Sequence, residues 1–347
     1  MISIENIIER VSSSKKPSRE DIVSLLSLEG DDATKLFEAA DSITKQNFNN
    51  EIYIRGIIEF SNYCRCNCSY CGLAAFNRKI PRYRMSVEEI VETAHKAFEA
   101  SYKTIVLQSG EDMFYTSDMI CEIVKQIKSI GDIAITLSVG ERPFEEYQKF
   151  IEAGADRFLI KHETADETLY NSLHPHSNFE NRITCLKNLK KLGFQTGSGF
   201  MIGLPGQTLD TIASDILLLH DLGIHMAGIG PFLPHPETPL KDTPSGSTFL
   251  TLKAVALTRL IIKTAMLPAT TSLGVANVAD KNHSFKSGAN VIMQKLQPYK
   301  YRRLYEIYPK ATGHEKSIIQ ERQELENLIK SFGRSVSASR GDHKNFF

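Results

Sequence analysis

The stretch EIYIRGIIEFSNYCRCNCSYCGL, residues 51–73, joins a long apolar run to a loop that holds four of the chain's six cysteines. These are Cys64, Cys66, Cys68 and Cys71, which fall within eight positions. The β-branched and aromatic residues of the run are typical of a strand, and nearly continuous apolar character is typical of a strand that is buried on both faces. The stretch therefore predicts a buried strand with a cluster of cysteines directly after its end.

Further short apolar runs follow, and helix-length segments of mixed charge lie between most of them. The eight expected strands are residues 52–61, 104–110, 133–140, 157–163, 195–203, 226–232, 269–274 and 289–293. One intervening segment begins with a capping box, in which Ser86 and Glu89 would cap each other's backbone at a helix N-terminus. Eight strands that alternate with helices predict an α/β fold of the (β/α)8 TIM-barrel type, and an open doubly wound sheet is the alternative.

The pattern divides the chain into three parts. Residues 1–50 are expected to form an N-terminal helical extension, because residues 21–47 show short helical periods interrupted by a glycine. Residues 51–310 are expected to form the barrel. Residues 311–347 are expected to form a C-terminal helix and a flexible tail, because the end of the chain, FGRSVSASRGDHKNFF, is small and polar and should fray.

Composition argues against several classes of protein. The 347 residues include 41 Lys plus Arg and 41 Asp plus Glu, so the formal charge is zero and no electrostatic footprint for nucleic acid is evident. The sequence has no run of about 18 apolar residues and no N-terminal segment of the secretory kind. We therefore expect a cytoplasmic protein that binds neither nucleic acid nor a membrane.

In a reducing compartment, clustered cysteines are expected to be metal ligands or redox thiols rather than disulfides. A zinc site made of all four thiols is one interpretation, although the loop would be cramped and no second pair of Cys or His residues follows at a suitable spacing. The subset Cys64-x3-Cys68-x2-Cys71 suggests another interpretation. Three thiolates in a short loop can hold three irons of a cubane cluster and leave the fourth iron without a protein ligand.

The CxxxCxxC spacing directly after a first barrel strand, with Tyr70 just before the last cysteine, resembles the radical S-adenosylmethionine (SAM) superfamily. The resemblance implies that Cys64, Cys68 and Cys71 hold one [4Fe-4S] cluster and that SAM binds its open iron. It also implies that the reduced cluster cleaves SAM to methionine and a 5′-deoxyadenosyl radical. Cys66 matches no position of the motif and is expected to be a spectator.

The resemblance further implies which residues hold SAM. Ser109-Gly110-Glu111, after the second strand, is similar to the Gly-Gly-Glu turn that receives the methionine amino group. Glu163 and Arg182 are similar to the ribose-binding acid and the carboxylate-binding arginine, whose planar fork suits a carboxylate. The segment GSGFMIGLPGQT, residues 197–208, is similar to the strand that lies along the adenine. The full expected set is Tyr70, Gly110, Glu111, Asp112, Ser138, Glu163, Arg182, Met201 and Tyr305.

Between residues 20 and 330 or so, the chain resembles one family of the superfamily, the HydE maturases of [FeFe]-hydrogenases. The most specific matches are QSGED at 108–112 and GPFLPHPETPL at 230–240. The resemblance implies a small iron–carbonyl–cyanide–cysteine precursor as substrate, a low-potential electron donor such as ferredoxin or flavodoxin, and other hydrogenase maturases as partners. It places the substrate pocket on strands at Arg55, Gln108, Thr136, Thr270 and Thr271, with Tyr305 closing one side.

The sequence departs from this family at two points. Many members hold a second iron–sulfur cluster through C-terminal cysteines, but no cysteine follows Cys185, so we expect no second cluster. Lys161 stands where relatives can carry Arg, so that a point charge would replace a fork.

Two other functions stay open. Motifs shared with methylornithine synthase leave a radical mutase acting on an amino acid as one alternative. A non-catalytic iron–sulfur scaffold protein is the alternative from another class.

Overall fold

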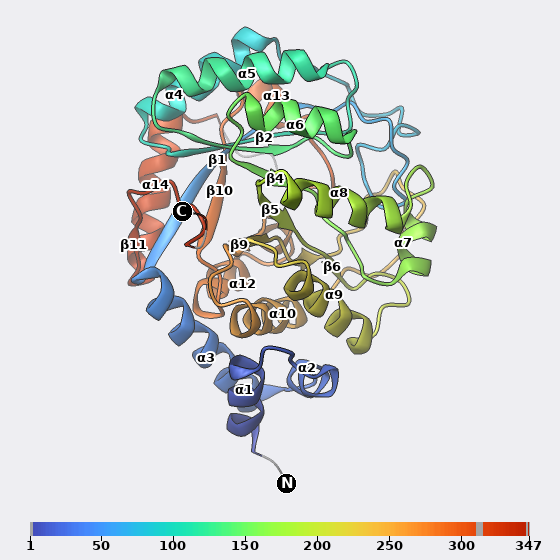
Figure 1. Ribbon diagram of the computed structural model, residues 1–347, viewed down its shortest axis with the longest axis vertical. Coiled ribbons are helices and arrows are strands. Elements are labelled where there is room, and N and C mark those ends of the chain that lie inside the picture. Colours follow the sequence, from blue (N-terminus) through green and yellow to red (C-terminus); the bar gives the residue numbers. More distant parts are fainter. Residues whose placement is uncertain (1–2, 310–314, 345, 347) are drawn as a thin grey trace.

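The computed structural model of the chain describes residues 3–309, 315–344 and 346. Its N-terminal part is helical and comprises α1 (Ile4–Ser13), α2 (Arg19–Leu26) and α3 (Gly30–Phe48). These helices pack on one another, and α3 packs along α10 (Thr248–Ile261), so that they extend from the lower end of the molecule in Figure 1. The predicted N-terminal helices are therefore present.

Within the described residues, eight parallel strands form the barrel that the sequence predicted. Their spatial order is β7 (Met226–Ala227), β5 (Gln195–Ser198), β4 (Arg157–Leu159), β3 (Ala134–Ser138), β2 (Thr104–Ser109), β1 (Glu51–Ser61), β10 (Val291–Lys295) and β9 (Pro268–Ala269). The two ends of this order meet in a parallel bridge between Met226 and Met266, where the Ala227 amide donates to the Met266 carbonyl at 3.1 Å. This bridge brings the sheet to near closure.

Helices surround these strands (Figure 1) because each helix buries one apolar face against the outside of the sheet. They are α4 (Val87–Glu99), α5 (Ser117–Ile130), α6 (Phe144–Glu152), α7 (Glu167–Leu173), α8 (Phe179–Lys191), α9 (Leu209–Asp221) and α10. The predicted capping box at the start of α4 is present. The Ser86 hydroxyl accepts from the Glu89 amide at 3.2 Å, and the Glu89 carboxylate accepts from the Ser86 amide at 3.0 Å.

Two of the expected strands continue beyond the barrel. β6 (Met201–Ile202) follows β5, β8 (Gly230–Pro231) follows β7, and the two form a small parallel sheet of their own. Between β5 and β6 the backbone at Gly199 lies close to the backbone at Gly228, which lies between β7 and β8. Only glycine allows this approach, because a Cβ at Gly199 would lie 2.1 Å from the Gly228 carbonyl oxygen.

The expected strand at 269–274 is wrong over most of its length. Only Pro268–Ala269 is a strand, and Thr271–Ala276 forms helix α11 with Thr270 as its N-cap, so neither threonine lies on a strand. β-Branched threonine suggested a strand, but β10 pairs with β9 at only two positions, Pro268 and Ala269. Beyond them the backbone satisfies its hydrogen bonds within a helix. A helix α12 (Val278–His283) and a 3-10 turn η1 (Ser284–Lys286) follow.

The expectation that the chain frays after residue 332 is also wrong for residues 335–344. After α13 (Tyr299–Arg302) and α14 (Ile318–Ser331), strand β11 (Ser335–Val336) pairs in parallel with the start of β1. The small polar residues suggested an exposed tail, but Arg340 and Asp342 form ion pairs with residues of the barrel. The charges of the tail thus have partners that lie far away in the sequence.

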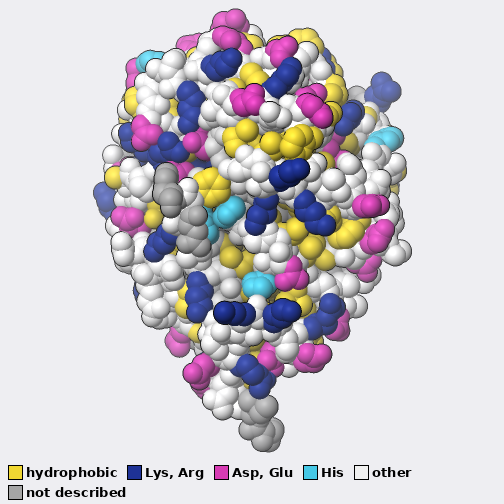
Figure 2. All heavy atoms as spheres, viewed as in Figure 1, with side chains coloured by type: hydrophobic (Ala, Val, Ile, Leu, Met, Phe, Trp, Pro, Cys, Tyr) yellow, Lys and Arg dark blue, Asp and Glu magenta, His cyan; other side chains and the backbone are white. Residues whose placement is uncertain are grey.

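Charged side chains of both signs are interspersed over the face of the molecule in Figure 2, in keeping with the equal numbers of basic and acidic residues. None of the helices in the described part of the chain combines the length and the apolar character that a membrane crossing requires.

Candidate active site

The C-terminal ends of the barrel strands surround a pocket of about 360 Å³. Parallel barrel strands all end at the same mouth, so residues from distant parts of the sequence converge there. The predicted residues that line the pocket are Arg55, Cys64, Cys68, Tyr70, Cys71, Gln108, Gly110, Glu111, Thr136, Ser138, Glu163, Arg182, Met201, Thr270, Thr271 and Tyr305. Asp112 is the one predicted site residue that is absent from the described lining.

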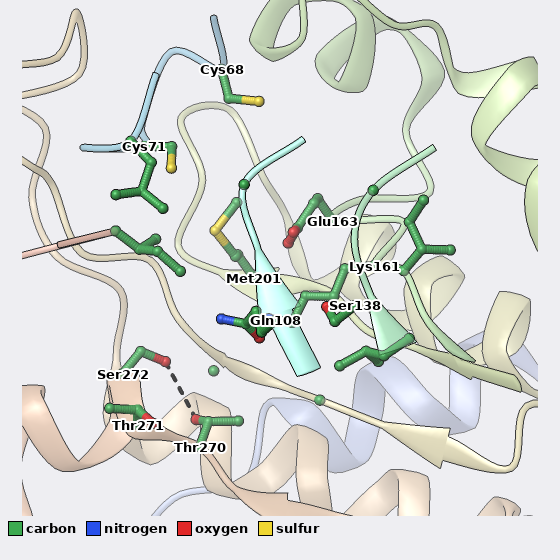
Figure 3. Close-up of a pocket in the computed structure, with 18 of the residues that line it drawn as sticks. Cys68, Cys71, Gln108, Ser138, Lys161, Glu163, Met201, Thr270, Thr271 and Ser272 are labelled. Atoms are coloured by element: carbon green, nitrogen blue, oxygen red, sulfur yellow. Dashed lines mark hydrogen bonds between the residues drawn. The ribbon is translucent and has the colours of Figure 1, made fainter. Parts of the chain in front are cut away.

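The cysteine loop forms one wall of this pocket. Figure 3 shows Cys68 and Cys71 on the loop at the upper left of the view, with Glu163 and Met201 nearer its centre. The Cys64 sulfur accepts hydrogen bonds from the Cys66 and Glu111 amides, each at 3.4 Å. The loop packs directly on the end of β2, because a Cβ at Gly110 would lie 2.7 Å from the Cys64 Cβ. Cys66, which is expected to be a spectator, also lines the pocket.

Burial controls the ionisation of these thiols. It raises the pKa of Cys71 to about 12 and that of Cys68 well above its ordinary value. A hydrogen bond from the Cys66 thiol lowers the pKa of Cys64 to about 7. Cys68 and Cys71 are thus neutral at pH 7 until a metal takes the place of their protons.

The donor chemistry at the pocket fits an iron–sulfur cluster. Three half-buried thiols from one short loop line one cavity, and such a set can ligate three irons of a cubane. In the described part of the chain, no group of three or more His, Cys, Asp or Glu side chains is arranged to hold a single metal ion. A cubane spreads its ligands over separate irons and does not require such a group.

Glu163 adopts an unusual conformation at the end of β4. Its φ is +62°, a left-handed value that costs a residue with a side chain about 1 kcal/mol or more. Two backbone hydrogen bonds hold it there, from the Glu163 amide to Gly199 at 2.9 Å and from the Met201 amide to Glu163 at 3.0 Å. One carboxylate oxygen, Oε2, is buried and has no hydrogen-bond partner among the described residues. This free acceptor in the wall of the pocket fits a ligand that carries hydroxyl donors.

Arg182 reaches the pocket from α8 and is held by a carboxylate that the sequence analysis missed. Its Nε donates to Glu141 at 2.7 Å, and a terminal nitrogen donates to the Lys161 carbonyl. Burial by itself would raise the pKa of Glu141, but Arg182 outweighs it and that pKa lies below its ordinary value. The position of Glu141 in the motif LSVGERP, just after β3, was the only signal that could have indicated it.

Glu111 and Asp112, both expected to bind SAM, have different roles in the structure. Glu111 lines the pocket and accepts from the Glu141 amide at 3.0 Å and from Arg65 Nε at 3.1 Å. Asp112 is buried beside the loop, where it accepts from Arg84 at 2.7 and 2.9 Å and from the Ser61 hydroxyl at 2.6 Å. The structure therefore does not bring Asp112 to the pocket, because its carboxylate is occupied by Arg84.

Tyr70 has a histidine partner that sequence reasoning missed. Its hydroxyl lies 2.9 Å from His174 Nε2, and the other ring nitrogen of His174 lies 2.8 Å from the Tyr170 carbonyl. His174 lies in the loop after α7, and no sequence signal marks it.

The lumen holds a third residue that was missed. Glu59 of β1 is buried and accepts from Lys295 at 2.8 Å and from Gln297 at 2.5 Å. Close by, Gln108 donates to the Tyr305 hydroxyl at 3.2 Å. A charged residue inside the apolar run GIIEFS was a signal that could have revealed Glu59.

The deepest part of the pocket contains polar atoms without partners in the described structure. They include Arg55 Nε and the Thr136 hydroxyl. Burial lowers the pKa of Arg55 well below its ordinary value, and nearby Arg157 lowers it further. On another wall, the hydroxyls of Thr270 and Ser272 lie 3.3 Å apart (Figure 3). The lumen thus offers hydrogen-bonding groups to a small polar ligand.

Comparison with known proteins identifies relatives of this chain. Residues 58–219 match the family model described as the radical SAM superfamily. The [FeFe] hydrogenase maturase subunit HydE of Thermotoga maritima is 52% identical over 274 residues, which are 79% of this chain and 78% of that protein. The 3-methylornithine synthase of Methanosarcina acetivorans is 30% identical over 291 residues, 83% of this chain and 82% of that protein.

The solved structures give the same fold. The crystal structure of methylornithine synthase (PylB) superposes with a TM-score of 0.83 at 24% identity, covering 95% of this chain and 97% of that one. This agreement confirms the barrel architecture.

Proposed function

Since the chain belongs to the radical SAM superfamily, and within it to the family of the [FeFe] hydrogenase maturase HydE, we propose that it uses SAM to process a small iron–cysteine precursor. The product would be an intermediate of the diiron cofactor of [FeFe]-hydrogenase. The observation that carries this proposal is the convergence of Cys64, Cys68 and Cys71 with the free carboxylate oxygen of Glu163 at one pocket. The chain is an enzyme of the radical SAM class, and the proposal concerns its substrate and its site residues.

In this proposal Cys64, Cys68 and Cys71 would hold one [4Fe-4S] cluster. When bound, the cluster supplies the electron that splits SAM into methionine and a 5′-deoxyadenosyl radical. The residues of the chain bind and orient SAM. Glu163 would accept hydrogen bonds from the ribose hydroxyls, because its Oε2 lacks a partner in the described structure.

The other SAM contacts follow from their places in the same wall. The methionine end would lie against Gly110 and Glu111, beside the cysteine loop, and Arg182 would attract the carboxylate. The remaining contacts would come from Tyr70, Ser138, Met201 and Tyr305, all of which line the pocket.

The deeper lumen would take the precursor. Arg55, Gln108, Thr136, Thr270 and Thr271 line it, and they offer hydrogen-bond donors and hydroxyls to carbonyl, cyanide and carboxylate groups. Lys161 adds a positive charge at the wall. A barrel lumen holds the reacting groups close together and excludes water, both of which radical chemistry needs.

Partners and location follow from the same proposal. A low-potential donor such as ferredoxin or flavodoxin would reduce the cluster, and other hydrogenase maturases would deliver the precursor and receive the product. We place these steps in the cytoplasm, where clustered thiols stay reduced.

Two substrates separate the proposal from its nearest alternative. The similarity to 3-methylornithine synthase, 30% identity, motivates a radical mutase acting on an amino acid. The reconstituted protein should be reduced with dithionite in the presence of SAM, with either the iron–cysteine precursor or lysine. We expect 5′-deoxyadenosine in both mixtures and conversion of the iron precursor alone. Formation of methylornithine from lysine would favour the mutase, and a complete lack of 5′-deoxyadenosine would favour a scaffold protein.

A further inference from the structure

The C-terminal segment 335–344 lies across the end of the barrel that is opposite to the pocket mouth. Its contacts are with the first residues of several barrel strands. Thr104, Arg157 and Gln195 are the first residues of β2, β4 and β5. β11 pairs with Glu51 and Ile52, the first residues of β1. Figure 1 shows the C-terminal end in front of β1 and β10.

Hydrogen bonds attach this segment to each of those strands. The Arg340 carbonyl accepts from the Thr104 hydroxyl at 2.7 Å and from Arg157 at 2.9 Å. The His343 amide donates to the Gln195 side chain at 2.9 Å. The segment thereby joins β1, β2, β4 and β5 at the bottom of the lumen.

The segment also carries the charge that balances the bottom of the barrel. Arg157 is fully buried and donates to Asp342 Oδ1 at 2.6 Å, and Gln195 donates to the same oxygen at 2.8 Å. Arg340 lies beside Asp342 at 3.0 Å and also pairs with Asp156 and Asp132, at 2.7 and 2.9 Å. A buried guanidinium without a counter-charge is strongly destabilising, so Arg157 depends on Asp342.

The segment reaches the pocket itself through Arg55. This residue lines the deep end of the pocket and donates to the Gly341 carbonyl at 3.4 Å and to the Met226 sulfur at 3.1 Å. Gly341 has a φ of +66°, and a Cβ there would lie 2.6 Å from the Tyr53 ring. A glycine is therefore needed for the segment to lie against the lumen wall.

We propose that residues 335–344 form the floor of the reaction chamber, and that Asp342 is a positioning residue that supplies the counter-charge for Arg157. The floor closes the lumen to solvent from below, while SAM and substrate enter from the mouth. This role rests on the proposed radical chemistry, which needs a chamber without free access of water and small solutes.

Deletion of residues 335–347 tests the floor. Hydrogen–deuterium exchange of the reconstituted protein with SAM should be followed at 51–56, 103–106, 156–159 and 194–197. We expect exchange there to become about tenfold faster or more, with α8 at the mouth unchanged. Equilibrium binding of SAM should stay within about twofold, because the mouth is intact. If the segment only stabilised the protein, its deletion would raise exchange in all segments alike. If the segment closes the lumen, its deletion raises exchange at the bottom segments alone.

Chemical rescue tests the charge of Asp342. Asp342→Ala should raise exchange at the same bottom segments, and added formate should restore protection while neutral formamide of the same shape should not. Asp132→Ala is the matched control, because Asp132 pairs with Arg340 from the exposed side of the same segment. The control should behave as the unaltered protein. Asp342→Glu, which keeps the charge, should retain most of the protection.

Several outcomes would overturn the inference. One is a folded deletion variant that exchanges at the bottom segments at the original rate. If the deletion variant does not fold, exchange at the bottom segments of Asp342→Ala decides instead. Equal rescue of that variant by formate and formamide would show that Asp342 does not act through its charge. These measurements require SAM binding but no turnover. A failure of precursor conversion would count against the proposed function and leave the result for the floor unaffected.

Discussion

Glu163 occupies a strained backbone conformation at the point where β4 meets the pocket. Its φ of +62° is one that side chains rarely adopt, and its Oε2 has no partner in the described chain. Strain that persists at a pocket wall needs surroundings that enforce it. Here the backbone hydrogen bonds to Gly199 and from Met201 enforce it, and the result is a carboxylate with one oxygen free for a ligand.

Replacement of this carboxylate should weaken SAM binding. Glu163→Gln keeps the size of the side chain but removes the charge that strengthens a hydrogen bond to the ribose. Because a hydrogen bond to a charged group contributes about 2 kcal/mol, we expect SAM affinity to fall by about 10- to 100-fold. Equilibrium binding of SAM to the reconstituted variant measures this effect.

Two further variants distinguish the effect of the Glu163 carboxylate on SAM binding from the effect of its backbone strain on stability. Glu167→Gln changes an exposed glutamate of the neighbouring α7 and should leave binding unchanged. Glu163→Gly should also bind SAM weakly, yet unfold at the same temperature or higher, because glycine adopts this φ without strain. Unchanged affinity in Glu163→Gln would remove Glu163 from the SAM site.

The cysteines differ in their expected contributions. Serine at Cys64, Cys68 or Cys71 should abolish the cluster and the formation of 5′-deoxyadenosine, because a cubane needs all three thiolates. Cys66→Ser is the matched control in the same loop and should keep both. Iron analysis, the visible absorption spectrum and product assay measure the result. Loss of the cluster in Cys66→Ser, with retention in one of the others, would mean that the ligand set is different.

At the scale of an element, the cysteine loop is held by a clamp outside the pocket. Asp112 pairs with Arg84, whose guanidinium lies over the Tyr63 ring at 3.7 Å and over the Phe114 ring at 4.5 Å. Tyr63 precedes Cys64 directly, so the clamp fixes the chain at the start of the loop. Asp112 thus positions the loop without contact to the pocket.

Loss of this clamp should lower stability in a pH-dependent way. Burial opposes the charge of Asp112, but Arg84 and Ser61 outweigh it, so the pKa of Asp112 lies below its ordinary 3.8 in the folded protein. A carboxyl whose pKa is lower in the folded state than in the unfolded state stabilises the folded protein fully at pH values above its unfolded pKa. This contribution is lost as the pH falls through its folded pKa. Asp112→Asn should therefore cost about 2 kcal/mol at pH 7 and progressively less below pH 3.8.

Denaturant unfolding of the cluster-free protein at a series of pH values measures this difference. Asp118→Asn is the control, because Asp118 forms an exposed pair with Lys149 at 3.1 Å. We expect it to cost less than about 0.5 kcal/mol at any pH. Equal effects of the two substitutions would contradict the role of the clamp.

At the scale of the whole molecule, the distribution of cysteines along the chain predicts how many clusters it holds. No cysteine follows Cys185 in the sequence, so we expect one cluster. Chemical reconstitution should saturate at about four irons for each chain. Almost no iron should then be retained by the triple variant Cys64→Ser, Cys68→Ser, Cys71→Ser. Saturation at about eight irons, or iron retained by the triple variant, would indicate a second site.

The barrel could be predicted because each of its strands has a local signature. Short apolar runs alternate with amphipathic segments, and each of the eight runs overlaps a strand of the barrel, the seventh only at Ala269. The exception is the end of the seventh run, where Thr271 begins a helix. Its composition suits either structure, and the choice depended on how far the neighbouring strand could pair with it.

The pocket was predictable only in part. The cysteines and the Ser-Gly-Glu turn follow strand ends, and strand ends of a barrel meet at one mouth. The partners of these residues could not be predicted in the same way. Tyr70 meets His174 at 2.9 Å, and these residues lie 104 positions apart.

The sequence by itself determined the cysteine motif and the order of strands and helices, because both depend on residues that are close together in the chain. Only the tertiary structure decided which charged groups meet. Arg182 finds Glu141 across 41 positions, and Arg157 finds Asp342 across 185. The physical reason is that a charge is stable in the interior only beside a partner, and no local pattern of residues records where the fold will bring that partner.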